Sequence, residues 1–99
     1  MMKKNEFNEL YKVILTRIKS GDSNSYTKKL IKQGSKKIAQ KVGEECSELI
    51  VDYLKGSKKR TIEEAVDLIF HIFVMLSSKK ITYNDIEKEI LKRKNVRRK

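Results

Sequence analysis

The sequence predicts an all-α fold, a bundle of four to five helices built around an antiparallel helical hairpin. Apolar residues recur at steps of three and four over long stretches, which is the spacing of one helix face. No segment shows the alternation of a β-strand, and the chain contains no proline to interrupt a helix. Gly21, Gly34 and Gly56 lie between these stretches, where glycine commonly ends a helix.

The expected helices follow one another with short connections. We place N-caps at Ser35, Thr61 and Thr82, and Thr61 opens a capping box with Glu64. Residues 56–60 are expected to form a basic loop between the third and fourth helices. The predicted helices cover residues 5–20, 28–33, 35–55, 61–78 and 83–93, followed by a basic tail at 92–99.

The 99 residues are expected to form one domain, residues 1–99, with a modest core. The formal charge of +11 suggests a polyanionic partner, but aromatic residues are not interleaved with the basic runs, which argues against nucleic acid. Compositional bias towards lysine is the alternative explanation. A single cysteine, no secretory signal and no membrane-spanning stretch predict a cytoplasmic protein.

The two long helices have contrasting faces. In the third, one sector is charged and the opposite sector is apolar, so that Cys46 is expected to be a buried small side chain. The fourth is apolar almost all round and is therefore expected to be buried, with Glu64, Asp67 and His71 on one face. The apolar sector of the third helix consists of Ile38, Val42, Cys46, Leu49 and Tyr53.

Four carboxylates stand out within these helices. Glu45 and Glu48 are three positions apart, as are Glu64 and Asp67. A hairpin with a short loop should bring the two pairs to similar heights, and carboxylates among apolar residues need positive partners. Because oxygen ligands without a cysteine or histidine cluster suit Mg²⁺ or Mn²⁺, we predict a metal site formed by these four residues.

Simpler interpretations exist for individual residues. Glutamate and lysine at helical spacing form ordinary surface ion pairs, and for Glu44 this is as good an explanation as function. Glu63 is expected only to complement the helix dipole. His71 alone fits a core histidine, although its position one turn after Asp67 also suits a substrate contact.

At these residues the chain resembles a known group of enzymes. The segments Glu44-Glu45-Cys46-Ser47-Glu48 and Glu64-Ala65-Val66-Asp67 are similar to the EExxE and ExxD signature of the all-α nucleotide pyrophosphohydrolase (MazG-like) superfamily. Within this superfamily, the chain resembles the phosphoribosyl-ATP pyrophosphohydrolase branch over a wider stretch, residues 17–93. The specific likeness lies in Ser25-Tyr26-Thr27 and in segments 37–45, 67–74 and 89–93.

This resemblance implies a reaction and a site. The reaction is Mg²⁺-dependent hydrolysis of phosphoribosyl-ATP to phosphoribosyl-AMP and pyrophosphate, the second step of L-histidine biosynthesis, in a homodimer. By position, Glu45, Glu48, Glu64 and Asp67 would be metal ligands, and Glu45 or Glu48 would orient or deprotonate the attacking water. The implied substrate and phosphate contacts are Lys37, Lys41, Arg93, Tyr26 and His71.

Two alternative functions stay open. A house-cleaning pyrophosphohydrolase would use the same carboxylates on nucleotides such as dUTP or dCTP. A basic helical module that binds nucleic acid would account for the charge, but it would leave four converging carboxylates unexplained.

Overall fold

The computed structural model describes residues 5–22 and 24–95 and confirms the all-α prediction. Within these residues there are five α-helices and no strand. None of the described helices is long and apolar enough to span a membrane. The helices are α1 (Glu6–Ser20), α2 (Tyr26–Gln33), α3 (Ser35–Lys55), α4 (Lys58–Ser78) and α5 (Tyr83–Lys94).

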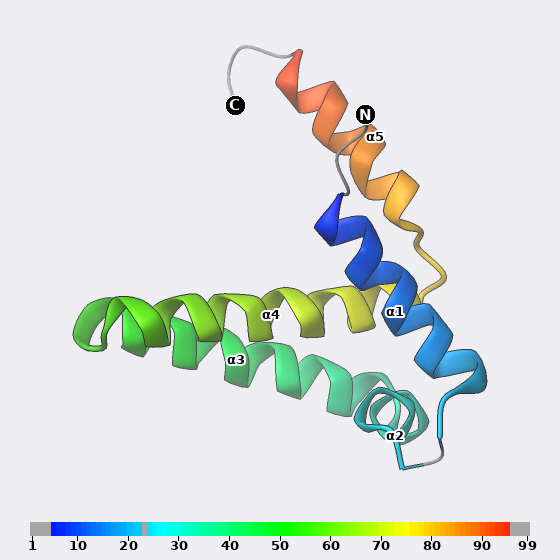
Figure 1. Ribbon diagram of the computed structural model, residues 1–99, viewed down its shortest axis with the longest axis horizontal. Helices are drawn as coiled ribbons and strands as arrows, with labels where there is room; N and C mark the ends of the chain where they lie inside the picture. Colours follow the sequence, from blue (N-terminus) through cyan, green and yellow to red (C-terminus); the bar gives the residue numbers. More distant parts are fainter. Residues whose placement is uncertain (1–4, 23, 96–99) are drawn as a thin grey trace.

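The hairpin of α3 and α4 is the longest feature of the molecule, and the two helices run antiparallel along their whole length (Figure 1). Helices α1 and α2 pack against the end of the hairpin opposite its loop, and α5 lies beside α1 (Figure 1). The predicted hairpin is therefore confirmed. The basic tail begins later than expected, because Lys92 and Lys94 still belong to α5; residues 96–99 of the predicted tail lie outside the described part.

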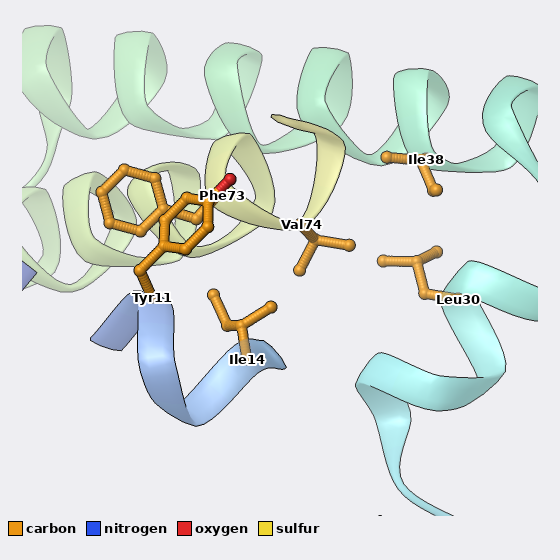
Figure 2. Packing of buried hydrophobic residues seen from close by; sticks show 6 residues of the cluster. All are labelled: Tyr11, Ile14, Leu30, Ile38, Phe73 and Val74. Carbon is orange, nitrogen blue, oxygen red and sulfur yellow. The ribbon is translucent and has the colours of Figure 1, made fainter. Parts of the chain in front are cut away.

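The core lies where α1, α2, α3 and α4 meet. Six apolar side chains are buried there, and Figure 2 shows that they come from all four of these helices. The rings of Tyr11 and Phe73 pack with their centroids 5.1 Å apart, and the Tyr11 hydroxyl donates to the Ile81 carbonyl, which ties α1 to the start of α5. The six residues are Tyr11, Ile14, Leu30, Ile38, Phe73 and Val74.

Side-chain caps define the helix starts. Asn5 Oδ1 accepts from two backbone N–H groups of α1, and Ser25 caps α2. Thr82 caps α5 as predicted, in a reciprocal capping box with Asp85. The predicted N-cap at Ser35 is wrong, because Gly34 is the N-cap of α3. The φ of Gly34 is +99°, a conformation that disfavours any side chain at this position.

The start of α4 also differs from the prediction. The helix begins at Lys58 with Ser57 as its cap, so Thr61 lies inside the helix and Arg60 is not in a loop. The Thr61 hydroxyl donates to the carbonyl of Ser57 at 2.9 Å and to that of Asp52 at 3.1 Å. Thr61 thus joins the first turn of α4 to the last turn of α3, and the connecting loop shrinks to Gly56 and Ser57.

The half of the hairpin nearest its loop carries exposed apolar side chains, contrary to the expectation of a fully buried fourth helix. Tyr53 is 75% exposed although it was assigned to the apolar face of α3, and Cys46 is exposed rather than buried. Helices α1 and α2 lie at the other end of the hairpin and do not cover the half near its loop (Figure 1). The exposed set is Ile50, Val51, Tyr53, Leu54, Ile62 and Val66.

Candidate metal and phosphate site

The hairpin brings together three of the four predicted carboxylates. Glu45 and Glu48 lie one turn apart on α3, and Glu64 lies on the facing turns of α4. One carboxylate oxygen from each falls within 4.8 Å of the other two. Three carboxylates this close repel one another unless a cation lies between them, so the arrangement suits a metal ion.

Two members of this group are removed from water. Glu64 is 4% exposed and Glu45 is 8% exposed, whereas Glu48 is exposed. Glu64 Oε1 is fully buried and has no hydrogen-bond partner. A buried carboxylate oxygen without a partner is costly, and a bound cation would supply the missing partner.

Arg60 is the main counter-charge of Glu64. Its guanidinium donates to Glu64 Oε2 at 2.7 Å and to Glu63 Oε1 at 2.9 Å, and it lies 3.7 Å from Asp52 Oδ2. The contacts with Glu63 and Glu64 follow from helical spacing, since these residues lie three and four positions after Arg60, whereas the contact with Asp52 joins α4 to α3. Arg60 was missed from the sequence because residues 56–60 were expected to form a loop. With a helix that begins at Lys58, the spacing of four between Arg60 and Glu64 would have predicted this ion pair.

The pKa of Glu45 is raised above its usual value. Burial is the largest cause, followed by the negative charge of Glu48, with smaller contributions from Asp67 and Glu64. His71 acts in the opposite direction, and Lys41 Nζ lies 3.8 Å from Glu45 Oε2. Glu45 therefore sits where a proton is held more tightly than on an ordinary surface glutamate.

Asp67 is near this group without joining it. Its side chain is exposed, and the three-residue carboxylate group does not include it. Its charge nevertheless contributes to the raised pKa of Glu45, so the carboxylate lies within electrostatic range of the site. The assignment of Asp67 as a fourth ligand stays a prediction.

Lysine side chains line the same stretch of α3. Lys41 Nζ donates to Glu44 Oε1 at 3.2 Å, and Gln40 donates to Glu44 Oε2 at 2.8 Å. These hydrogen bonds lower the pKa of Glu44, with a smaller contribution from Lys37, and the bond to Glu44 raises the pKa of Lys41. Glu44 thus holds Lys41 next to Glu45, which places a cation beside the carboxylate group.

Tyr26 and His71 form a hydrogen-bonded pair across α2 and α4. His71 is buried, and its Nδ1 lies 2.8 Å from the Asp67 carbonyl oxygen. Because a carbonyl only accepts, Nδ1 carries a proton, and Nε2 lies within hydrogen-bond distance of the Tyr26 hydroxyl oxygen, at 2.7 Å. Burial is the main cause of a raised Tyr26 pKa, which the positive charge of Lys41 partly offsets. Both residues therefore lie within electrostatic range of Glu45. Their mutual contact was not predicted.

Arg93 is the one predicted contact residue that the structure does not bring to this site. Its Nε donates to Glu89 Oε2 at 3.0 Å within α5, and its side chain lines a separate groove between α4 and α5. Nothing among the described residues joins Arg93 to Glu45, Glu48 or Glu64.

An antiparallel helical hairpin that gathers carboxylates beside lysines, in a chain without strands in its described part, fits the class of all-α nucleotide pyrophosphohydrolases. Comparison with known proteins agrees with this class. The family profile described as phosphoribosyl-ATP pyrophosphohydrolase matches residues 7–94. The chain belongs to the phosphoribosyl-ATP pyrophosphohydrolase family, and is therefore a hydrolase of a pyrophosphate bond.

Relatives with the same family name are similar over nearly their whole length. The phosphoribosyl-ATP pyrophosphatase of Sulfolobus acidocaldarius is 42% identical over 92 residues, covering 93% of this chain and 97% of that protein. The corresponding protein of Sulfurisphaera tokodaii is 40% identical over 92 residues, covering 93% and 98%. That of Saccharolobus solfataricus is 42% identical over 86 residues, covering 87% and 92%. The resemblance seen in the sequence is confirmed.

Proposed function

We propose that this chain hydrolyses phosphoribosyl-ATP to phosphoribosyl-AMP and pyrophosphate, as a Mg²⁺-dependent cytoplasmic enzyme of L-histidine biosynthesis. The names of its relatives support the substrate. The cluster of Glu45, Glu48 and Glu64, with a buried oxygen that lacks a partner, is the observation that supports the metal dependence. Manganese would satisfy the same oxygen ligands.

The residues present fit a divalent cation. Glu45, Glu48 and Glu64 would hold it, and Asp67, which lies within electrostatic range, would be the fourth ligand. The group contains no cysteine and no histidine, which suits a hard cation rather than zinc. Bound Mg²⁺ would stabilise negative charge on the phosphates and acidify water.

The remaining chemistry belongs to the side chains. Glu45 or Glu48 would accept the proton of the attacking water, and the raised pKa of Glu45 makes its carboxylate a stronger base than an ordinary surface glutamate. Lys41, held by Glu44, and Lys37 on the preceding turn would contact the phosphates. The Tyr26–His71 pair would lie against the substrate beside these groups.

A homodimer would explain two features that the single chain leaves open. The exposed apolar side chains near the hairpin loop, among them Tyr53 and Leu54, would be buried against a second copy. A second copy could also bring its own α5 to the cleft, so that Arg93 of the partner subunit would reach the phosphates. Both features support the predicted dimer in which two chains complete each active site.

Pyrophosphate release from phosphoribosyl-ATP, measured with Mg²⁺ and again with chelator, tests this function. Turnover should require the metal; turnover that persists without any divalent ion would overturn the carboxylate mechanism. A panel that includes dUTP and dCTP tests the house-cleaning alternative, which a preference for free nucleotides would favour. Salt-dependent DNA binding without hydrolysis would favour the nucleic-acid alternative.

A further inference from the structure

A cavity of about 350 Å³ lies outside the carboxylate group, where α1 ends and α2 begins. Its walls come from the last turn of α1, the turn that follows it, the first turn of α2 and Phe70 of α4. The residues on which its chemistry depends are Arg17, Asp22, Ser25, Tyr26 and Phe70. None of them takes part in the carboxylate cluster.

Tyr26 joins this cavity to the proposed catalytic site. It lines the cavity, and its hydroxyl is hydrogen-bonded to His71 at 2.7 Å. Its pKa responds to the charges of Lys41, Glu45 and Asp67, so the tyrosine lies within electrostatic range of the carboxylates. A ligand that spans Tyr26 would therefore have one part at the carboxylates and another in the cavity.

The walls of the cavity suit a sugar phosphate. Arg17 is exposed and forms no ion pair with any described residue, so its guanidinium can bind a phosphate through two parallel hydrogen bonds. The first turn of α2 contains no acidic residue, and its N-terminus also favours an anion. The rings of Tyr26 and Phe70 lie at 28° to each other with centroids 6.3 Å apart and offer apolar faces.

Asp22 is the one acidic group in the cavity. Its Oδ1 accepts from the backbone N–H of Asn24 at 2.9 Å, which shapes the turn before Ser25. A carboxylate repels a phosphate but accepts hydrogen bonds from hydroxyl groups. The cavity therefore combines a cation for a phosphate with an acceptor for the ribose hydroxyls.

We propose that this cavity binds the phosphoribosyl end of the substrate, with Arg17 as the ligand of its terminal 5-phosphate. This inference rests on the proposed function. A substrate of that class carries two separated anionic groups, a triphosphate and a sugar phosphomonoester, and the carboxylate site with its metal would account only for the first. A free nucleoside triphosphate lacks the second group, so Arg17 would determine specificity.

Kinetics of Arg17→Gln with two substrates test this role. With phosphoribosyl-ATP, KM should rise about tenfold or more while kcat changes little, because the lost contact binds ground state and transition state alike. With ATP, which lacks the second phosphate, KM should not change. Lys19→Gln, on the same exposed turn of α1 but outside the cavity lining, is the matched control. An equal effect of Arg17→Gln on both substrates, or no effect on either, would overturn the inference.

Binding of ribose 5-phosphate to the metal-free protein provides a readout without catalysis. The probe should shift the backbone amide resonances of Gly21, Ser25 and Tyr26 in the wild type, and the shifts should disappear in Arg17→Gln but persist in Lys19→Gln. Shifts elsewhere, or shifts unchanged in Arg17→Gln, would refute the site. If the probe binds here but phosphoribosyl-ATP is not hydrolysed, the proposed function fails while the sugar-phosphate site stands.

Discussion

Arg60 and Glu64 form a charge pair in which only one oxygen of the carboxylate is satisfied. The guanidinium donates to Glu64 Oε2 at 2.7 Å, and Glu64 Oε1 stays buried without a partner. Arg60 itself is half exposed, with a side-chain exposure of 52%, whereas that of Glu64 is 5%. The two oxygens thus have different roles: one is held by the protein, and the other is available to the proposed metal.

Replacement of Arg60 should therefore destabilise the metal-free protein more than the metal-loaded one. Arg60→Gln removes the guanidinium from Glu64, and a buried charge without a partner is strongly unfavourable. The melting temperature should fall in chelator, and the difference from wild type should shrink at saturating Mg²⁺. Lys59→Gln is the control, because Lys59 is exposed and has no ion pair among the described residues. An equal change in melting temperature with and without Mg²⁺ would show that Arg60 does not act on the metal site.

Glu48→Gln should abolish turnover without harming the fold. Glu48 is exposed, so the substitution buries no new polar group, yet it removes one of the three clustered carboxylates. We expect kcat to fall by about 100-fold or more, a typical loss for an essential acid–base group. Glu63→Gln, at an exposed residue outside the cluster, should retain most activity. Circular dichroism checks folding, and an unfolded Glu48→Gln protein would assign this residue a structural role instead.

The raised pKa of Glu45 predicts a pH dependence with a definite sign. Because burial favours the protonated form, the folded protein binds this proton more tightly than the unfolded chain, whose glutamate titrates near 4.5. The contribution of Glu45 to the free energy of unfolding is therefore greatest below pH 4.5 and is lost as the pH rises through the raised pKa. Thermal unfolding in chelator at a series of pH values measures this loss.

Two further observations check the role of Glu45. Glu45→Gln should flatten the pH dependence in that window, since the amide does not titrate. Affinity for Mg²⁺ in the wild type should increase over the same window, because the metal requires the ionised carboxylate. A wild-type profile that matches the variant would show that another group controls the titration.

Tyr26→Phe should destabilise the protein modestly by leaving His71 Nε2 without its hydrogen-bond partner. His71 is 6% exposed, and loss of one hydrogen bond to a buried group costs about 1 kcal/mol, reduced where water can reach the site beside the half-exposed Tyr26. Urea unfolding of the metal-free protein measures the effect. Tyr53→Phe is the matched control, because that hydroxyl makes no hydrogen bond within the described residues. Identical stability of Tyr26→Phe and wild type would show that the pair contributes nothing.

Leu54→Glu should convert a dimer into a monomer that is still helical. Leu54 is 70% exposed in the single chain, so a charge there disturbs no internal packing but opposes burial against a second copy. Light scattering coupled to size-exclusion chromatography reports the mass. Val13→Glu, at an exposed apolar residue of α1 that is not part of the hairpin, should leave the mass unchanged. A wild-type protein that is monomeric at all concentrations would refute the dimer.

Much of the site could be predicted from spacing alone. The intervals between Glu45 and Glu48 and between Glu64 and Asp67 are helical, and the short connection made α3 and α4 antiparallel neighbours. Arg60 was missed because Thr61 also has the composition of an N-cap, and a cap at that position would exclude Arg60 from the helix. Ser57, four residues earlier, forms the cap instead.

The burial of Cys46 was predicted wrongly for a related reason. A helical wheel shows which residues share a face, but not which face meets a neighbour. Ile38 and Glu45 are buried on α3, while Cys46 and Tyr53 are exposed. The rotation of a helix about its own axis is determined by packing against other helices, and the apolar side chains near the loop of this hairpin are exposed in the described part of the chain. 

The sequence by itself determined the helical class, the hairpin, the residue types of the site and the family, because these depend on local spacing and on residue identity. Only the tertiary structure decided that one oxygen from each of Glu45, Glu48 and Glu64 lies within 4.8 Å of the others. It also decided that Tyr26, 45 positions away along the chain, contacts His71. Such contacts depend on how whole helices pack and rotate, which local periodicity does not specify.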